Sequence, residues 1–207
     1  MSSPANSSGA RIASWGARAA VVVALVAALA QVLYYVLHVR GKWLLNMNTH
    51  ASVFGAVSLL ALAAACGAAA LLSAADAHSR LVRLLPAVLA ALLGLRVIHP
   101  ANVILLALPL VVAAFVALWW RVGAPGSDAQ RAVRAGCVVL VGSYLLHAFG
   151  ASLLSAFGYG EHTRLVHAEL LLRHTGELAG WMLVATGLAA AHACRRGGRL
   201  SPPISMG

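Results

Sequence analysis

Six runs of apolar residues, each close to the length of a membrane crossing, dominate this chain of 207 residues. A helix needs about 20 apolar residues to cross the hydrocarbon core of a bilayer. Hydrophobic residues make up 61% of the chain and only 10% are charged, which is more apolar surface than a soluble domain of this size can bury. We therefore expect an all-α, polytopic membrane helix bundle with six transmembrane helices and no separate soluble domain. The predicted helices cover residues 19–37, 51–74, 81–98, 101–120, 132–157 and 163–194.

The segments outside these runs predict two short tails. Residues 1–18 are interpreted as a mobile cytoplasmic N-terminal tail, residues 19–194 as the six-helix transmembrane domain, and residues 195–207 as a disordered cytoplasmic C-terminal tail. Ala28-Leu29-Ala30 follows a basic start and is similar to a signal-peptidase site. The apolar run continues through Leu37, however, so a retained first helix is favoured over a cleaved signal peptide.

The basic residues are distributed unequally between the two sides of the predicted bundle. The chain has 15 Lys and Arg against 5 Asp and Glu. The side with both termini holds ten of them: Arg11, Arg18, Arg80, Arg83, Arg121, Arg131, Arg134, Arg195, Arg196 and Arg199. The other side holds five: Arg40, Lys42, Arg96, Arg164 and Arg173. The positive-inside rule then predicts cytoplasmic termini in a bacterial-type inner (plasma) membrane, with the lipid bilayer and not nucleic acid as the partner of the basic residues.

Histidine is unusually frequent, with nine residues against five carboxylates. If the chain crosses six times, seven of the nine fall in the half of the bundle away from the termini: His38, His50, His99, His147, His162, His167 and His174. Ionisable side chains are costly in lipid, so those within helices are expected to face the bundle interior and to mark a functional site.

The last predicted helix, residues 163–194, contains several of these ionisable side chains. His167, His174 and Trp181 are seven residues apart and share one stripe of the helix. Arg173 has Glu169 four residues before it and Glu177 four residues after it, within side-chain reach. This spacing predicts that Arg173 pairs with a carboxylate, or with a bound anion, and does not face lipid.

Histidines on neighbouring helices could together bind a metal. The candidate ligands are His50, His147, His167, His174 and Glu177, and imidazole suits zinc, copper and haem iron. Each histidine taken singly is better explained as a hydrogen bond between helices. For the cluster as a whole, a haem or metal site is the favoured hypothesis. In such a site, Arg96 or Arg173 would bind the anionic group of the cofactor, since a guanidinium matches a carboxylate such as a haem propionate.

Motif searches leave the enzymatic question open. The chain has no GxSxG, HExxH, Walker or GxGxxG sequence, and Cys66, Cys137 and Cys194 form no CxxC pair. Ser143 and His147 share a helix face, but a serine in a helix more often bonds its own backbone. Two alternatives to a haem site remain. One is a membrane-embedded zinc-dependent hydrolase with Glu177 or Glu161 as general base. The other is a small transporter or a proton or metal pathway, with His and Glu as relay groups.

Two fragments resemble the haem- and copper-containing membrane proteins of the NnrS type, which are distantly similar to haem–copper oxidase subunits. They are Thr49-His50-Ala-Ser-Val-Phe-Gly55, and Leu146-His147-Ala-Phe-Gly150 followed by Arg173-His174-Thr175-Gly176. The resemblance implies haem b or copper bound by His50, His147 and His174. It also implies a role in electron transfer, in gas handling under nitric oxide stress or in oxidase assembly, with a respiratory or redox protein as partner.

Overall fold

The computed structural model describes residues 4–37, 52–75, 80–98, 108–122, 125–159 and 164–200. These residues contain no strand, so the all-α prediction is confirmed for them. The elements are α1 (Pro4–Leu37), α2 (Val53–Ala75), α3 (Arg80–Ile98), α5 (Leu108–Arg121), α6 (Asp128–Leu145), the π-helical turn η2 (Leu146–Gly150), α7 (Ala151–Ala156) and α8 (Arg164–Leu200).

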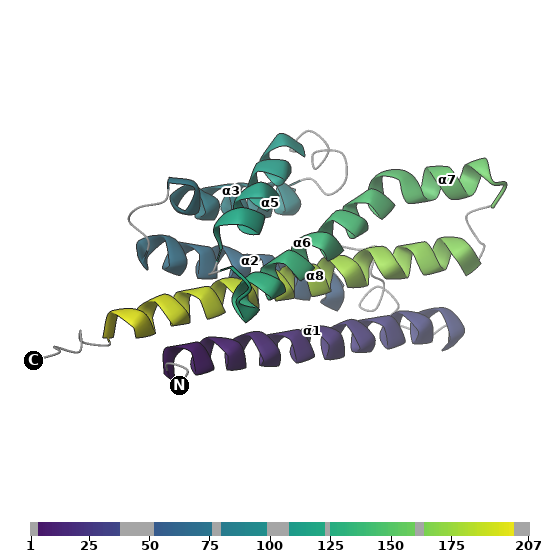
Figure 1. The fold of residues 1–207 in the computed structure, drawn as a ribbon. Helices are drawn as coiled ribbons and strands as arrows, with labels where there is room; N and C mark the ends of the chain where they lie inside the picture. The colour runs from purple at the N-terminus through teal and green to yellow at the C-terminus, as the bar shows by residue number, and fades with distance from the viewer. Residues whose placement is uncertain are drawn as a thin grey trace, which may run out of the picture.

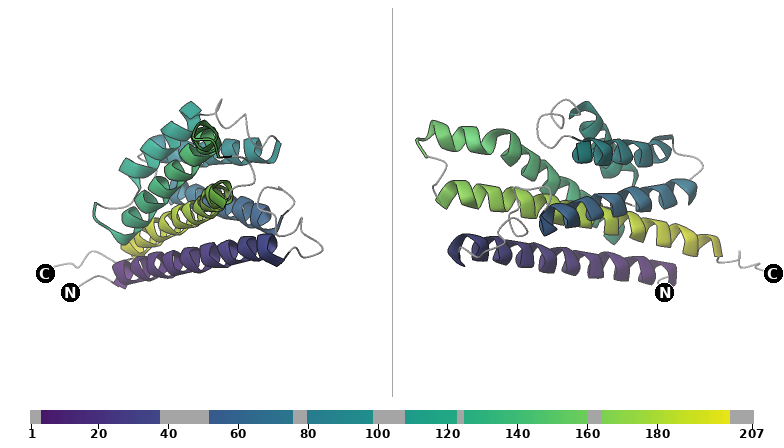
Figure 2. Two further views of the ribbon diagram at one scale, coloured as in Figure 1. Left: turned by 90° about the vertical axis from the view of Figure 1, so that its right-hand side faces the viewer. Right: turned by 180° about the vertical axis from the view of Figure 1, so that it is seen from behind.

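Helix α8 is the centre of the bundle. Helices α1, α2 and α6 all pack against it, α3 packs on α2, and α5 lies between α3 and α6 (Figure 1). The three largest side chains of α8 that are fully buried, Trp181, Leu178 and Leu188, lie within its middle and second half. Figure 2 shows the same arrangement from two further sides, with α1 covering one side of α8 and α6 the other.

Four of the helices are long and apolar enough to cross a membrane: Ser8–Leu33, Val53–Ala75, Asp128–Gly150 and Leu165–Arg196. The other two predicted crossings correspond to shorter helices. Helix α5 has 14 residues, or roughly 21 Å at the rise of an α-helix, against a hydrocarbon core of about 30 Å. Its predicted start, residues 101–107, lies outside the described residues. The apolar part of α3 covers Val82–Leu95. A multi-pass bundle is therefore supported with four candidate crossings.

The first and last helices extend beyond their predicted bounds. Helix α1 begins at Pro4, although residues 1–18 were predicted to be a mobile tail, and α8 continues to Leu200, although its predicted end was residue 194. The physical reason for the extension of α1 is that its first turns pack on α8. A side chain at Gly9 would collide with the Cys194 thiol, and one at Gly16 would collide with Thr186. Small residues let the two helices approach closely, and this contact orders a segment whose own sequence gives no such signal.

Glycines also bring α6 and α8 into close contact. A Cβ atom added at Gly136 would lie 2.8 Å from the Gly180 carbonyl oxygen, and one added at Gly187 would lie 2.9 Å from the Ala129 carbonyl oxygen. Val184 and Val133 fill the spaces beside these glycines. Backbones this close are typical of membrane helix pairs that associate through small residues.

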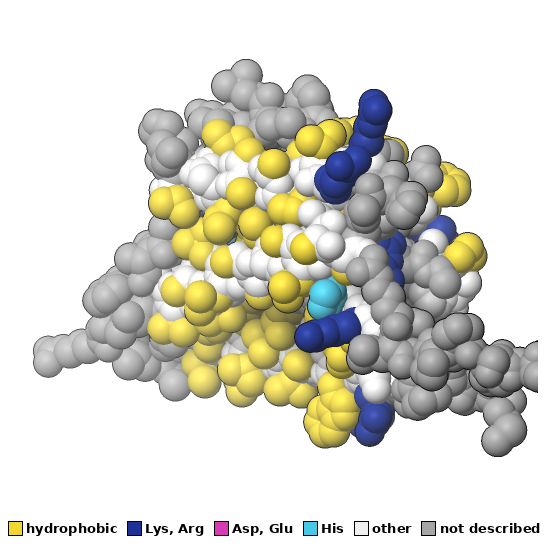
Figure 3. Space-filling model, turned by 90° about the vertical axis from the view of Figure 1, so that its left-hand side faces the viewer, with side chains coloured by type: hydrophobic (Ala, Val, Ile, Leu, Met, Phe, Trp, Pro, Cys, Tyr) yellow, Lys and Arg dark blue, Asp and Glu magenta, His cyan; other side chains and the backbone are white. Residues whose placement is uncertain are grey.

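The basic side chains gather at one end of the molecule. The start of α1 and the end of α8 lie at the same end of the bundle (Figure 1), which agrees with the prediction that the termini share one side. Figure 3 shows Lys and Arg side chains grouped at this end and hydrophobic side chains over the rest of the visible face. Among the arginines with described side chains, Arg80, Arg83, Arg131 and Arg134 lie in the first two turns of α3 and α6, Arg195 and Arg196 in the last two turns of α8, and Arg11 and Arg18 in the first half of α1.

Candidate functional site

The contacts of α6 and η2 with α8 determine which residues lie at the same depth in the bundle. Gly136 lies against Val184, Ser143 lies against Gly176, and Gly150 lies against Glu169. The two helices are therefore antiparallel, and residues 143–150 are level with residues 169–176 of α8. Ser143, His147 and Gly150 follow one another at intervals of four and three residues, which keeps them on the stripe that faces α8.

Polar side chains converge at this depth, and we call them the polar layer: Gln31, Ser143, His147, Glu169, Arg173, His174 and Glu177. Gln31, Ser143, Glu169 and Glu177 are buried, with 2–6% of each residue exposed. Gln31 belongs to the layer because α1 runs antiparallel to α8 and Gly16 lies against Thr186. Gln31 is fifteen residues after Gly16, so it lies level with about residue 171 of α8, which is fifteen residues before Thr186.

Arg173 is held inside the layer by its neighbours on α8. Its Nη1 atom lies 4.0 Å from Glu169 Oε1, and its side chain is only 17% exposed. The sequence-based prediction that Arg173 lies against a carboxylate and not against lipid is confirmed. The Glu169 carboxylate is 6% exposed, so the pair has little contact with solvent or lipid. A charge pair at this depth is costly to desolvate, and each partner depends on the other to remain charged.

The same guanidinium also contacts the neighbouring imidazole. Arg173 Nη2 lies 3.0 Å from His174 Nε2. A guanidinium can only donate hydrogen bonds, so Nε2 accepts and the ring proton resides on Nδ1. The contact occupies the lone pair that a metal would need at Nε2 and places a fixed positive charge beside it.

The π-helical turn gives Glu169 room against the neighbouring helix. Gly150 ends η2, and a Cβ atom there would lie 2.8 Å from Glu169 Oε1 and 3.0 Å from its carboxyl carbon. Only glycine lets the backbone of η2 approach the carboxylate this closely. π-Helical turns are rare and frequently occur at functional sites. This one places a carboxylate in contact with backbone at the buried edge of the layer.

Ser143 links α6 to α8 within the layer by a hydrogen bond. Its hydroxyl donates to the Arg173 carbonyl oxygen at 2.6 Å. The sequence favoured a hydrogen bond from this serine to its own helix; the bond crosses to α8 instead, because Gly176 brings the two backbones close. Gln31 was not among the sequence candidates. The available signal was a single amide inside the apolar run of the first helix, which is costly in lipid.

Glu177 forms the deep end of the layer, and Trp181 lies one turn beyond it. Arg134 is level with about residue 185 of α8, so Glu177 lies roughly 12 Å further into the bundle than the basic end. Trp181 is 1% exposed, as expected for the interior stripe, and its indole N–H has no hydrogen-bond acceptor among the described residues. Glu169 Oε1 likewise accepts no hydrogen bond from them. Buried polar atoms of this kind usually bond to water or to a ligand.

The remaining candidates are divided between described and undescribed parts of the chain. His147 and His174 share the layer, and His167 lies on α8 two residues before Glu169. His50, Glu161 and the Arg96 side chain lie outside the described residues. The predicted convergence of His174 with His50 stays a prediction.

The described side chains do not make a metal site by themselves. Within the described ranges, no three His, Cys, Asp or Glu side chains are placed so that they could hold a metal ion. A metal centre with three or more such ligands would have to draw on residues outside the described ranges, and the haem hypothesis stays a prediction.

Comparison with protein-family models, with curated proteins and with solved structures finds no match to this chain. The resemblance to NnrS-type proteins stays a prediction, and the function has to be argued from the geometry of the polar layer.

Proposed function

We propose that the protein is a proton-coupled membrane transporter and that the polar layer is its proton-binding site. The observation that carries the proposal is an excess of buried carboxylates. Glu169 and Glu177 are each 6% exposed, and one guanidinium, that of Arg173, lies between them on the same helix. One carboxylate can be balanced by Arg173. The three groups together carry a net negative charge, and the burial of net charge favours the binding of one proton by the group as a whole.

The neighbours of the carboxylates suit reversible proton binding. Glu169 lies toward the start of α8, Glu177 lies two turns deeper, and His174 lies between them. These three titratable groups extend along about 12 Å of the helix and give a proton successive binding positions. Trp181 donates no hydrogen bond to a described residue and lies one turn beyond Glu177. These groups form a short polar path that begins at the end of the bundle opposite the arginine-rich end.

Beyond Glu177, α8 packs tightly against α6 and α1. From Leu178 to Ala191, α8 packs against Gly136, Val133 and Ala129 of α6 and against Gly16 of α1. This arrangement does not suit an open channel, because apolar side chains and backbone fill the second half of the path. It suits a transporter in which the layer is reached from one side at a time.

The orientation follows from charge. We place the arginine-rich end in the cytoplasm of a bacterial-type inner membrane, since cytoplasmic loops carry an excess of Lys and Arg. The polar layer then opens toward the outer face. We also propose that α3 and α5 complete the six crossings.

The test is proton flux in liposomes. Purified protein is reconstituted with a trapped pH-sensitive dye, and a potassium diffusion potential drives protons inward. Wild-type protein should acidify the interior faster than protein-free liposomes do, and Glu177→Gln should return the rate to the protein-free level. Asp128→Asn is the matched control, because it also removes one carboxylate, but from a side chain that is 43% exposed and paired with Arg131 at the basic end.

The same preparation tests the haem hypothesis. A Soret band that disappears in His147→Ala and His174→Ala would favour haem over a proton site. Wild-type flux no faster than in protein-free liposomes, or full flux in Glu177→Gln, would contradict the proposal.

A further inference from the structure

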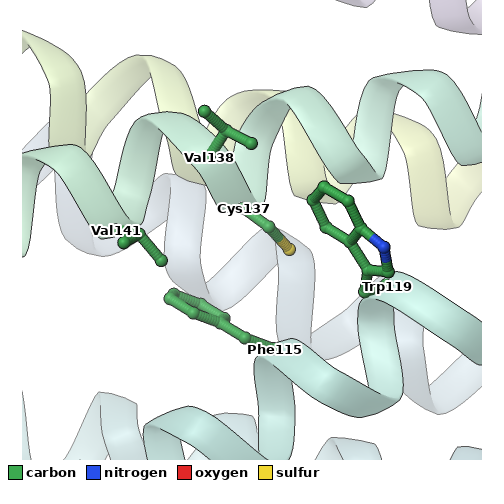
Figure 4. Close-up of a pocket in the computed structure, with 5 residues that line it drawn as sticks. All are labelled: Phe115, Trp119, Cys137, Val138 and Val141. Carbon is green, nitrogen blue, oxygen red and sulfur yellow. The ribbon is translucent and has the colours of Figure 1, made fainter.

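A second feature lies on the outside of the bundle, away from the polar layer. An apolar groove of about 200 Å³ runs between α5 and α6 and is lined by Phe115, Trp119, Cys137, Val138 and Val141 (Figure 4). Val138 and Val141 are 58% and 42% exposed, so the groove opens at the surface that these helices present to the bilayer. Cys137 forms its floor and is 2% exposed.

One cation is fixed at the end of this groove. Arg134 precedes Cys137, Val138 and Val141 by three, four and seven residues, so all four lie on one stripe of α6. The Arg134 Nε–H donates to the Trp119 carbonyl oxygen at 3.3 Å, and its guanidinium carbon lies 5.2 Å from the centre of the Trp119 ring. Trp119 therefore forms part of the groove and also holds the arginine beside it.

Both residues of this pair lie toward the ends of their helices: Arg134 is six residues after the start of α6, and Trp119 is two residues before the end of α5. Arg134 lies at the arginine-rich end of the bundle, and Val141 lies about 10 Å further along α6. Tryptophan is enriched at the level of lipid headgroups, and arginines at that level attract anionic lipids. A cation at the headgroup level and an apolar groove leading from it toward the bilayer centre are complementary to an anionic amphiphile.

From this arrangement we infer that the groove binds one anionic phospholipid. An acyl chain lies along Phe115, Cys137 and Val141, and the phosphate pairs with the Arg134 guanidinium. The charge complementarity distinguishes this occupant from a zwitterionic lipid, whose amine would lie near the same guanidinium. The inference does not depend on the proton-transport proposal, because the groove and the polar layer share no residue.

The test is native mass spectrometry of the detergent-solubilised protein with equal amounts of phosphatidylglycerol and phosphatidylcholine. Wild-type protein should retain phosphatidylglycerol in preference. Arg134→Gln should lower the ratio of bound phosphatidylglycerol to bound phosphatidylcholine about fivefold, the usual effect of one interfacial cation. Arg18→Gln is the matched control, since Arg18 also lies over a tryptophan, Trp15, at 5.9 Å, but neither of these two residues lines the groove.

A second variant tests the apolar half of the site. Val141→Phe fills the groove from a partly exposed position and leaves Arg134 in place, so it should reduce the retention of both lipids. An unchanged lipid ratio in Arg134→Gln, or an equal fall in Arg18→Gln, would overturn the inference. A lipid-free dimer that Val141→Phe dissociates would also overturn it, because the groove would then hold a second copy of the chain.

Discussion

Replacing Gly136 with alanine tests the packing that closes the bundle below the polar layer. The new Cβ atom would lie 2.8 Å from the Gly180 carbonyl oxygen and 3.0 Å from the Val184 backbone nitrogen. Ordinary van der Waals contact begins at 3.4 Å, so the shorter distance falls short by about 0.6 Å. Both neighbours are backbone atoms, which cannot rotate away, and the helices α6 and α8 must separate.

The expected cost follows from two opposing effects. Overpacking of a tight contact costs about 1–3 kcal/mol. Alanine is more favourable than glycine within a helix by about 0.5–1 kcal/mol. Gly142→Ala provides the control, because Gly142 lies on the same helix and a Cβ atom there would meet no atom within 4 Å. The difference between the two variants removes the helix-propensity effect and should equal the clash, about 1–3 kcal/mol.

The free energy of unfolding can be measured for each variant by titrating sodium dodecyl sulfate into mixed micelles and following tryptophan fluorescence. Gly136→Ala should unfold at lower detergent fraction than wild type, and Gly142→Ala at an equal or higher one. If the two variants shift the free energy of unfolding equally, the close approach of α6 and α8 at Gly136 is not present in the protein.

Three further predictions follow from the polar layer and the topology. Arg173→Met should lower the free energy of unfolding by about 3 kcal/mol because it leaves a buried carboxylate without its cation, and adding Glu169→Gln should restore most of the loss in the same detergent titration; no recovery would contradict the pairing. Gly150→Ala should displace the Glu169 carboxylate, so proton flux in liposomes should fall while the free energy of unfolding changes by less than about 1 kcal/mol, since the group that must move is the end of a flexible side chain; unaltered flux would count against Glu169. Reporter enzymes fused to the two ends of the chain should be active on the same side of the membrane, and activity on opposite sides would refute the shared end of α1 and α8.

The helices and the Arg173 pairing could be predicted from sequence because their causes are local. Apolar runs of spanning length predict helices, and the spacing of Glu169 and Arg173 predicts an ion pair on one helix. The heptad spacing of His174 and Trp181 correctly indicated a buried position for Trp181, which is 1% exposed.

The parts that could not be predicted depend on contacts between segments far apart in the chain. Gly9 and Cys194 become neighbours only when α1 and α8 pack, so the sequence of residues 1–18 alone resembled a tail. The hydrogen bond from Ser143 to the Arg173 carbonyl and the approach of Gly150 to Glu169 depend on the α6–α8 register and on the π-helical turn. Neither has a signature in the local sequence, and the same is true of the stacking of Arg134 on Trp119.

Infrared difference spectroscopy after a drop in pH is the most direct test of the central claim, since it detects protonation of individual carboxyl groups. The proton-site account predicts a carboxylic-acid C=O band that appears in wild-type protein, is lost in Glu177→Gln and is retained in Asp128→Asn. If no band in the folded protein depends on Glu177 or on Glu169, these carboxylates serve only as fixed structural charges, and the proton-coupled function is contradicted.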